Sequence, residues 1–159
     1  MPYRRIVVAA ALQRYLDVTP IAVRIRDLGE LIAAGHSAAI HLVSVDAPVD
    51  LLPGVETTAE KLERYADPLR EHGLGVQTGL RQGRPSRAIE DYVREVDADL
   101  LIMGSHSKRG PIDVGLGSTA SAISRELPAT VLLVRPTESE QERAQELMIP
   151  KYPLVFPYG

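Results

Sequence analysis

The chain has 159 residues, 45% of them hydrophobic and 25% charged, with a formal net charge of −3. This is the composition of a soluble globular domain. It lacks the basic excess of nucleic-acid-binding proteins, and no apolar run approaches the ~20 residues that span a bilayer. The absence of cysteine excludes disulfides, zinc–thiolate sites and thiol catalysis. We therefore expect a cytoplasmic protein with neither nucleic-acid nor membrane partners.

Five short apolar runs are predicted to be β-strands. They are RRIVVAA (4–10), AAIHLVSV (38–45), VQTGLRQ (76–82), ADLLIMG (98–104) and ATVLLVR (129–135). Four of them are almost continuously apolar, as expected of strands that are covered on both faces. The third alternates apolar and polar residues, which predicts a strand at the edge of the sheet.

Helical patterns separate these runs. Thr19 and Pro20 are typical of a helix start, and Gly35 is predicted to end that helix. A second helix is predicted from about Thr58 to His72, kinked or split at Pro68. The remaining three are expected to begin near Ser86, at Ser118 (a helix carrying Ile123 and Leu127) and after Pro136, the last capped by Ser139.

The alternation of strand and helix predicts an α/β fold, a doubly wound, Rossmann-like sheet of five parallel strands with helices on both faces. Residues 1–136 form this domain, and residues 137–159 form a C-terminal helix followed by an aromatic, proline-rich extension. Tyr152, Phe156 and Tyr158 in the extension indicate a tail that docks on its own domain or on a second subunit; the alternative is a disordered tail. Ligands of such sheets bind beyond the carboxyl ends of the strands.

One stretch at such an end is rich in glycine. GSHSKRGPIDVGLGST (104–119) connects the fourth strand to the next helix. Glycine backbone and a helix N-terminus can together present N–H groups to a phosphate. The alternative is an ordinary connection in which Ser118 is only an N-cap.

The same residues resemble a known family. IMGSHSKRGPIDVGLGST followed by PATVLLVRP, together with Gly83-Arg84-Pro85, YRRIVVA and AIHLVSV, is similar to the universal stress protein family. The similarity covers about residues 3–136. It implies a sheet in the order 3-2-1-4-5 and, in many members, an ATP site in the crevice of the sheet.

The resemblance implies an adenine-nucleotide site at the following positions: Ala9, Ala11, Val45, Met103, Gly104, Ser107, Lys108, Gly117, Ser118 and Thr119. Two of them depart from the family pattern, because Ala11 replaces an aspartate that binds the ribose and Ser107 replaces a glycine. The loss of a charged hydrogen-bond acceptor costs about 1.5–3 kcal/mol, or one to two decades in affinity. Weak nucleotide binding is therefore expected.

The resulting interpretation is a stress-response regulatory homodimer with a weak ATP or other adenine-nucleotide site, and with Mg²⁺ only alongside the nucleotide. The dimer is expected to form through the fifth strand, Thr130 to Arg135. The alternative is a nucleotide-free dimeric scaffold that acts through protein contacts. No catalytic residue or metal site is predicted, although slow ATP hydrolysis is left open.

Overall fold

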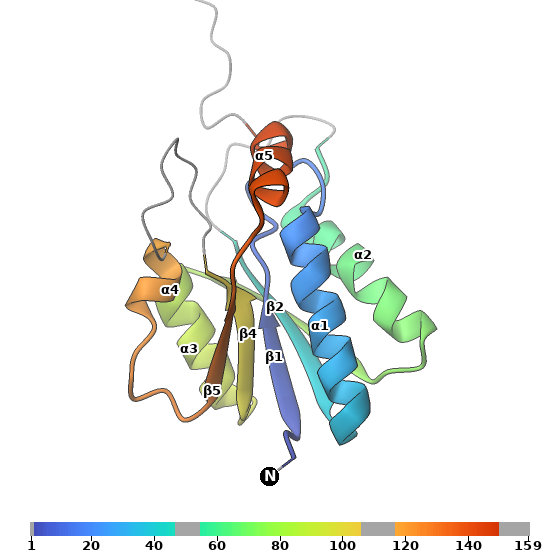
Figure 1. The fold of residues 1–159 in the computed structure, drawn as a ribbon, viewed down its shortest axis with the longest axis vertical. Helices are drawn as coiled ribbons and strands as arrows, with labels where there is room; N and C mark the ends of the chain where they lie inside the picture. Colours follow the sequence, from blue (N-terminus) through green and yellow to red (C-terminus); the bar gives the residue numbers. More distant parts are fainter. Residues whose placement is uncertain (1, 47–54, 106–116, 150–159) are drawn as a thin grey trace, which may run out of the picture.

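A computed structural model describes residues 2–46, 55–105 and 117–149. Strands and helices alternate along the chain (Figure 1). The elements are β1 (Arg5–Ala9), α1 (Pro20–His36), β2 (Ala39–Asp46), α2 (Thr58–Glu71), β3 (Val76–Gln82), α3 (Pro85–Glu95), β4 (Leu100–Gly104), α4 (Ser118–Ala122), β5 (Thr130–Val134) and α5 (Glu138–Leu147).

The five strands form one parallel sheet in the order β3-β2-β1-β4-β5. This confirms the predicted topology and places β3 at an edge, as its alternating pattern indicates. In the register of the sheet, Ala9 at the end of β1 pairs with Val43 on one side and Met103 on the other. The carboxyl ends of β1, β2 and β4 therefore meet at one edge of the sheet.

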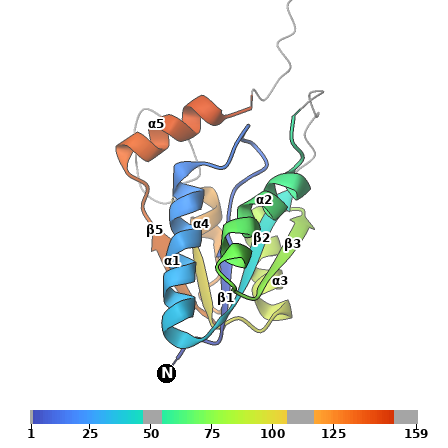
Figure 2. The same ribbon diagram turned by 90° about the vertical axis from the view of Figure 1, so that its right-hand side faces the viewer.

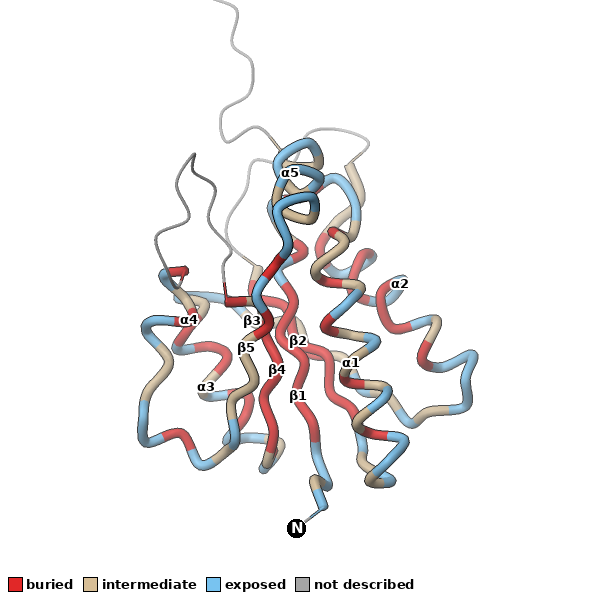
Figure 3. Tube along the Cα trace, viewed as in Figure 1, coloured by how far each residue is buried: buried red, intermediate tan, exposed pale blue. Residues whose placement is uncertain are grey.

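Each face of the sheet is covered by helices (Figures 1 and 2). Ile6 and Val8 of β1 belong to the core cluster beneath α1 and α2, whereas Val7 belongs to the cluster beneath α3 and α4. All three side chains are fully buried because successive strand residues point to opposite faces. The central strands β1 and β4 are buried except at one terminal residue of each, and α5 has no buried residue (Figure 3).

The predicted end of the first helix at Gly35 is wrong, and the second helix is not split at Pro68. Helix α1 continues through Gly35 and ends where Ser37 adopts a left-handed conformation, with φ of 54°. A glycine within a helix costs only about 1 kcal/mol, so packing overrides it. Helix α2 runs without interruption through Pro68. Its buried side chains, which include Leu62 and Leu69, hold it on the sheet despite the missing N–H group.

The last two helices also differ from the prediction. Helix α4 is only five residues long, and Gly117 rather than Ser118 is its N-cap. Ile123 is extended and ends the helix, although it still packs against the core beneath α3 and α4. Helix α5 is capped by Thr137 rather than Ser139, because Thr137 forms a reciprocal capping box with Glu140.

Candidate functional site

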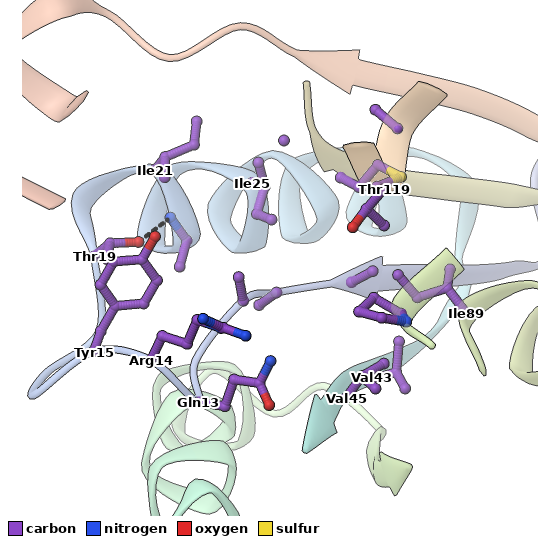
Figure 4. A pocket seen from close by; sticks show the side chains of 18 of the residues that line it. Gln13, Arg14, Tyr15, Thr19, Ile21, Ile25, Val43, Val45, Ile89 and Thr119 are labelled. Carbon is purple, nitrogen blue, oxygen red and sulfur yellow. Dashed lines mark hydrogen bonds between the residues drawn. The ribbon is translucent and has the colours of Figure 1, made fainter. Parts of the chain in front are cut away.

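A crevice opens between the ends of β1 and β4. These strands are neighbours, but the chain passes from β1 to a helix on one face and from β4 to a helix on the other. Such a divergence leaves space above the sheet, where ligands of open α/β sheets bind. A cavity of about 370 Å³ lies at this place (Figure 4).

The cavity has an apolar and a polar region. Val43, Val45, Ile89 and Met103 contribute apolar side chains from β2, α3 and β4. Most of the polar side chains come from the β1–α1 connection and from α4, and one comes from the residue after β4. They are Gln13, Arg14, Tyr15, Thr19, Ser105, Ser118 and Thr119. An apolar cavity with a few polar groups is the usual form of a small-molecule site.

The structure brings together most of the residues predicted to bind nucleotide. The following seven line the cavity: Ala9, Ala11, Val45, Met103, Gly104, Ser118 and Thr119. Gly117 is buried beside them and is not among the lining residues. Ser107 and Lys108 lie outside the described residues, as do the aromatic residues of the C-terminal extension.

The amide of Gly117 has a structural partner. It donates a hydrogen bond of 2.7 Å to the carbonyl oxygen of Ser105, which ties the start of α4 to the end of β4. Helix geometry leaves the next N–H groups, from Ser118 to Ala120, without partners inside the helix. The three residues from Ser118 to Ala120 line the cavity, whereas Gly117 orients α4.

The opposite wall is the β1–α1 loop, defined here as residues 10–19. Donors from three separate elements hold its backbone. Ser44 Oγ of β2 donates to the carbonyl oxygen of Ala10 at 2.8 Å. The N–H of Ile149 donates to the carbonyl oxygen of Arg14 at 2.7 Å. Thr19 ends the loop as the N-cap of α1, and its hydroxyl accepts from the N–H of Ala22 at 3.3 Å (Figure 4).

Lys61 of α2 provides the third support. Its Nζ donates to the carbonyl oxygens of Leu12 and Tyr15, and the residue is only 1% exposed. Burial lowers the pKa of the Lys61 ammonium below its ordinary value, because desolvation disfavours the charged form. The lysine thus fixes two points of the β1–α1 loop from beneath, and Leu12 lies fully buried in the core.

The segment after β5 supports the same loop from above. Leu16 N–H donates to the carbonyl of Leu147 at 2.7 Å, and Tyr15 forms an antiparallel bridge with Met148. Arg24 of α1 forms a bidentate pair with Glu140, with distances of 3.0 and 2.8 Å. Through these contacts α5 lies across the carboxyl edge of the sheet (Figures 1 and 2), and Met148 joins the lining of the cavity.

Arg14, Lys61 and Met148 are not among the residues predicted from the sequence to form the site, whereas Gln13 was considered as a partial replacement for the missing acid. Arg14 lies in the loop that follows the first strand, so its position beyond a carboxyl end was the available signal. Lys61 and Met148 carried no comparable signal, because their roles depend on contacts between distant segments. Across the described ranges there is no cluster of three or more His, Asp or Glu residues that could hold a metal ion. The same ranges contain no helix with the length and apolar character needed to cross a membrane.

Comparison with known proteins gives sequence matches and structural matches. A family model described as the universal stress protein family matches residues 2–135. A universal stress protein of Synechocystis sp. is 30% identical over 48% of this chain and 49% of its own length. Another from Methanocaldococcus jannaschii is 28% identical over 54% of this chain and 50% of its own length. The matches thus span about half the length of these curated relatives.

Solved structures share the fold. A universal stress protein in complex with cAMP has a TM-score of 0.62 and 21% identity, over 86% of this chain and 100% of that one. An Arabidopsis thaliana family protein with AMP bound has a TM-score of 0.63 and 18% identity, over 86% and 94%. A universal stress protein from Archaeoglobus fulgidus in complex with dAMP has a TM-score of 0.59 and 20% identity, over 84% of this chain and 98% of that one. The family model and the shared topology together show that this chain belongs to the universal stress protein family.

Proposed function

We propose that the cavity between the β1–α1 loop and α4 binds an adenine nucleotide, and that the chain acts as a stress-response regulatory protein through this site. The cavity at the divergence of β1 and β4 carries the proposal. Its volume of about 370 Å³ lies in the range of small-molecule sites, about 300–1,000 Å³. Three proteins of the same fold are described as complexes with cAMP, dAMP and AMP.

The two regions of the cavity suit the two parts of a nucleotide. A purine ring would be buried against Val43, Val45 and Met103, because planar apolar faces gain by leaving water. The ribose and phosphate would face the polar side chains of the β1–α1 loop and α4. Ala11 supplies no carboxylate for the ribose hydroxyls, so we expect weak affinity. More specifically, we propose ATP as the ligand, with Mg²⁺ bound only alongside it.

A variant that fills the cavity tests this proposal. Ala11 is exposed and lines the cavity, so Ala11→Trp would occupy the space without disturbing the core. Leu31→Trp is the matched control, since Leu31 is 71% exposed on α1 and does not line the cavity. Calorimetric titration with AMP, cAMP and ATP should show binding to the wild type and to Leu31→Trp, and at least tenfold weaker binding to Ala11→Trp. Equal binding by the two tryptophan variants would place the nucleotide elsewhere.

The proposal includes a homodimer formed through β5. This strand is an edge of the sheet, and its Val131, Leu132 and Leu133 are only partly buried within one subunit. An edge strand with unpaired backbone groups and apolar side chains gains by pairing with another copy. Sedimentation at micromolar concentration should give the mass of a dimer. A dimer that binds no nucleotide would favour the alternative function, a scaffold that acts through protein contacts alone.

A further inference from the structure

Arg14 differs from every other described residue that lines the cavity. It is the one charged side chain among them. Arg14 is exposed to solvent, and Figure 4 shows its guanidinium extending from the β1–α1 loop over the cavity, beside the Gln13 side chain. Within the described part of the chain, the Arg14 side chain takes part in no hydrogen bond or ion pair, whereas Arg24 and Arg64 are both bound to carboxylates.

The backbone that carries Arg14 is held on both sides. Its own carbonyl accepts from Ile149, and the neighbouring Tyr15 carbonyl accepts from Lys61. Tyr15 is 7% exposed and is bridged to Met148. The loop is therefore preorganised, and a ligand group that meets the guanidinium is spared the entropic cost of ordering the backbone.

The surroundings of Arg14 favour an anionic ligand group. Ala11 contributes a methyl group and no charge, and no described residue lining the cavity is acidic. A guanidinium offers a planar fork of N–H donors that matches phosphate oxygens. Hydrogen bonds from such a charged donor are about twice as strong as those from the neutral hydroxyls of Ser118 and Thr119.

We propose that Arg14 binds the phosphate group of the ligand, so that the cavity selects nucleoside phosphates over nucleosides. This inference rests on the nucleotide site proposed above and assigns its specificity to a single side chain. The shared chemistry is a phosphate on the ribose, attached at the 5′ position, at the 3′ position or as a 3′,5′-cyclic diester.

The experiment compares the wild type with Arg14→Gln and a matched control, Arg70→Gln. Arg70 is a partly exposed arginine of α2 that pairs with Glu63 and does not line the cavity. Each protein is titrated with adenosine, 5′-AMP, 3′-AMP and cAMP. We expect the wild type and Arg70→Gln to bind at least one of the three nucleotides about tenfold or more tightly than adenosine. A gain of about tenfold is the size expected of one hydrogen bond to a charged group. The nucleotide whose affinity exceeds that of adenosine by the largest factor identifies the ribose position at which Arg14 contacts the phosphate.

Arg14→Gln should bind adenosine as the wild type does and lose most of the preference for the phosphate. Its thermal unfolding should match that of the wild type, because the guanidinium has no described partner to lose. If Arg14→Gln keeps the wild-type ratio of phosphate to adenosine affinity, Arg14 is not the phosphate receptor, although the nucleotide site stands. An equal loss of adenosine and phosphate binding would assign Arg14 a structural role and overturn the inference. A wild type that binds none of the four ligands removes the nucleotide site and the inference together.

Discussion

The cavity lies between the β1–α1 loop and helix α4, and the two walls are held by different means. The loop has no regular secondary structure, yet β2, α2 and the segment after α5 all donate to its carbonyl groups. Helix α4 is a regular element of five residues, but its N-cap residue Gly117 has no side chain with which to cap it. The wall without regular secondary structure, the β1–α1 loop, is thus held by more contacts from other segments than the helical wall.

The physical reason lies in the number of independent supports. A single-turn helix satisfies few of its own backbone groups and needs contacts from outside. Helix α4 buries Ala120 and is tied to β4 through the Gly117–Ser105 hydrogen bond. The β1–α1 loop is supported from beneath by a buried cation and from above by backbone hydrogen bonds. The loop is therefore the wall better suited to present a ligand-binding side chain in a fixed position.

The largest expected effect comes from removing the support beneath the loop. Lys61→Met deletes the donor to the carbonyls of Leu12 and Tyr15 while it retains a similar apolar stem. We expect the free energy of unfolding to fall by about 2–4 kcal/mol, because both carbonyls lose their charged donor. Denaturant unfolding measures this loss. Arg70→Met on the same helix is the control and should change stability by no more than about 0.5 kcal/mol. Equal losses in the two variants would contradict the role assigned to Lys61.

A smaller loss should follow from removing the support above the loop. A chain that ends at Pro136 lacks the hydrogen bonds to Leu16 and Arg14 and the Arg24–Glu140 pair. The matched control ends at Ile149 and keeps all of them. We expect the shorter chain to be less stable than the control by about 1–3 kcal/mol, the sum of two backbone bonds and one partly exposed ion pair.

Amide hydrogen exchange shows which part of the protein loses stability when the chain ends at Pro136. The amide of Leu16 should exchange faster in the chain that ends at Pro136, because its acceptor, the carbonyl of Leu147, is gone. Amides in the middle of β1 should keep their relative protection, since Val7 and Val8 are fully buried between β2 and β4. Unchanged exchange at Leu16 would show that the loop does not depend on α5.

Local signals in the sequence predict most of the sheet and only part of the site. The runs that include Ile6–Val8 and Leu100–Ile102 are apolar on both faces, so they predict central strands without tertiary information. Thr19-Pro20 likewise predicts the start of α1. The resemblance to the universal stress proteins added the order of the strands and the positions that line the cavity.

The supports of the β1–α1 loop could not be predicted in the same way. Lysine is almost always exposed in folded proteins, so Lys61 in TAEKLER has the sequence pattern of a surface residue. Its burial depends on two carbonyl groups 46 and 49 residues away. Met148 reaches the cavity only because α5 folds back across the sheet edge. Such contacts depend on the tertiary packing of distant segments, which no short pattern encodes.

The smallest expected effect is a pH dependence that isolates the charge on Lys61. Burial lowers its pKa in the folded protein below the ordinary value of 10.5, so the folded state releases this proton at a lower pH than the unfolded state does. Between the two pKa values the unfolded state binds more protons, and the lysine contribution to stability rises with pH. The neutral amine has two N–H groups and can still donate to the carbonyls of Leu12 and Tyr15.

The stability deficit of Lys61→Met relative to the wild type should therefore widen as the pH is raised from neutral toward 10.5. Denaturant unfolding of both proteins across this range measures the deficit, and the comparison cancels the titration of the tyrosines that they share. Arg70→Met should show a constant difference from the wild type, because an arginine remains protonated throughout this range. A deficit of Lys61→Met that shrinks with rising pH would mean that the positive charge, rather than the two N–H groups, holds the loop.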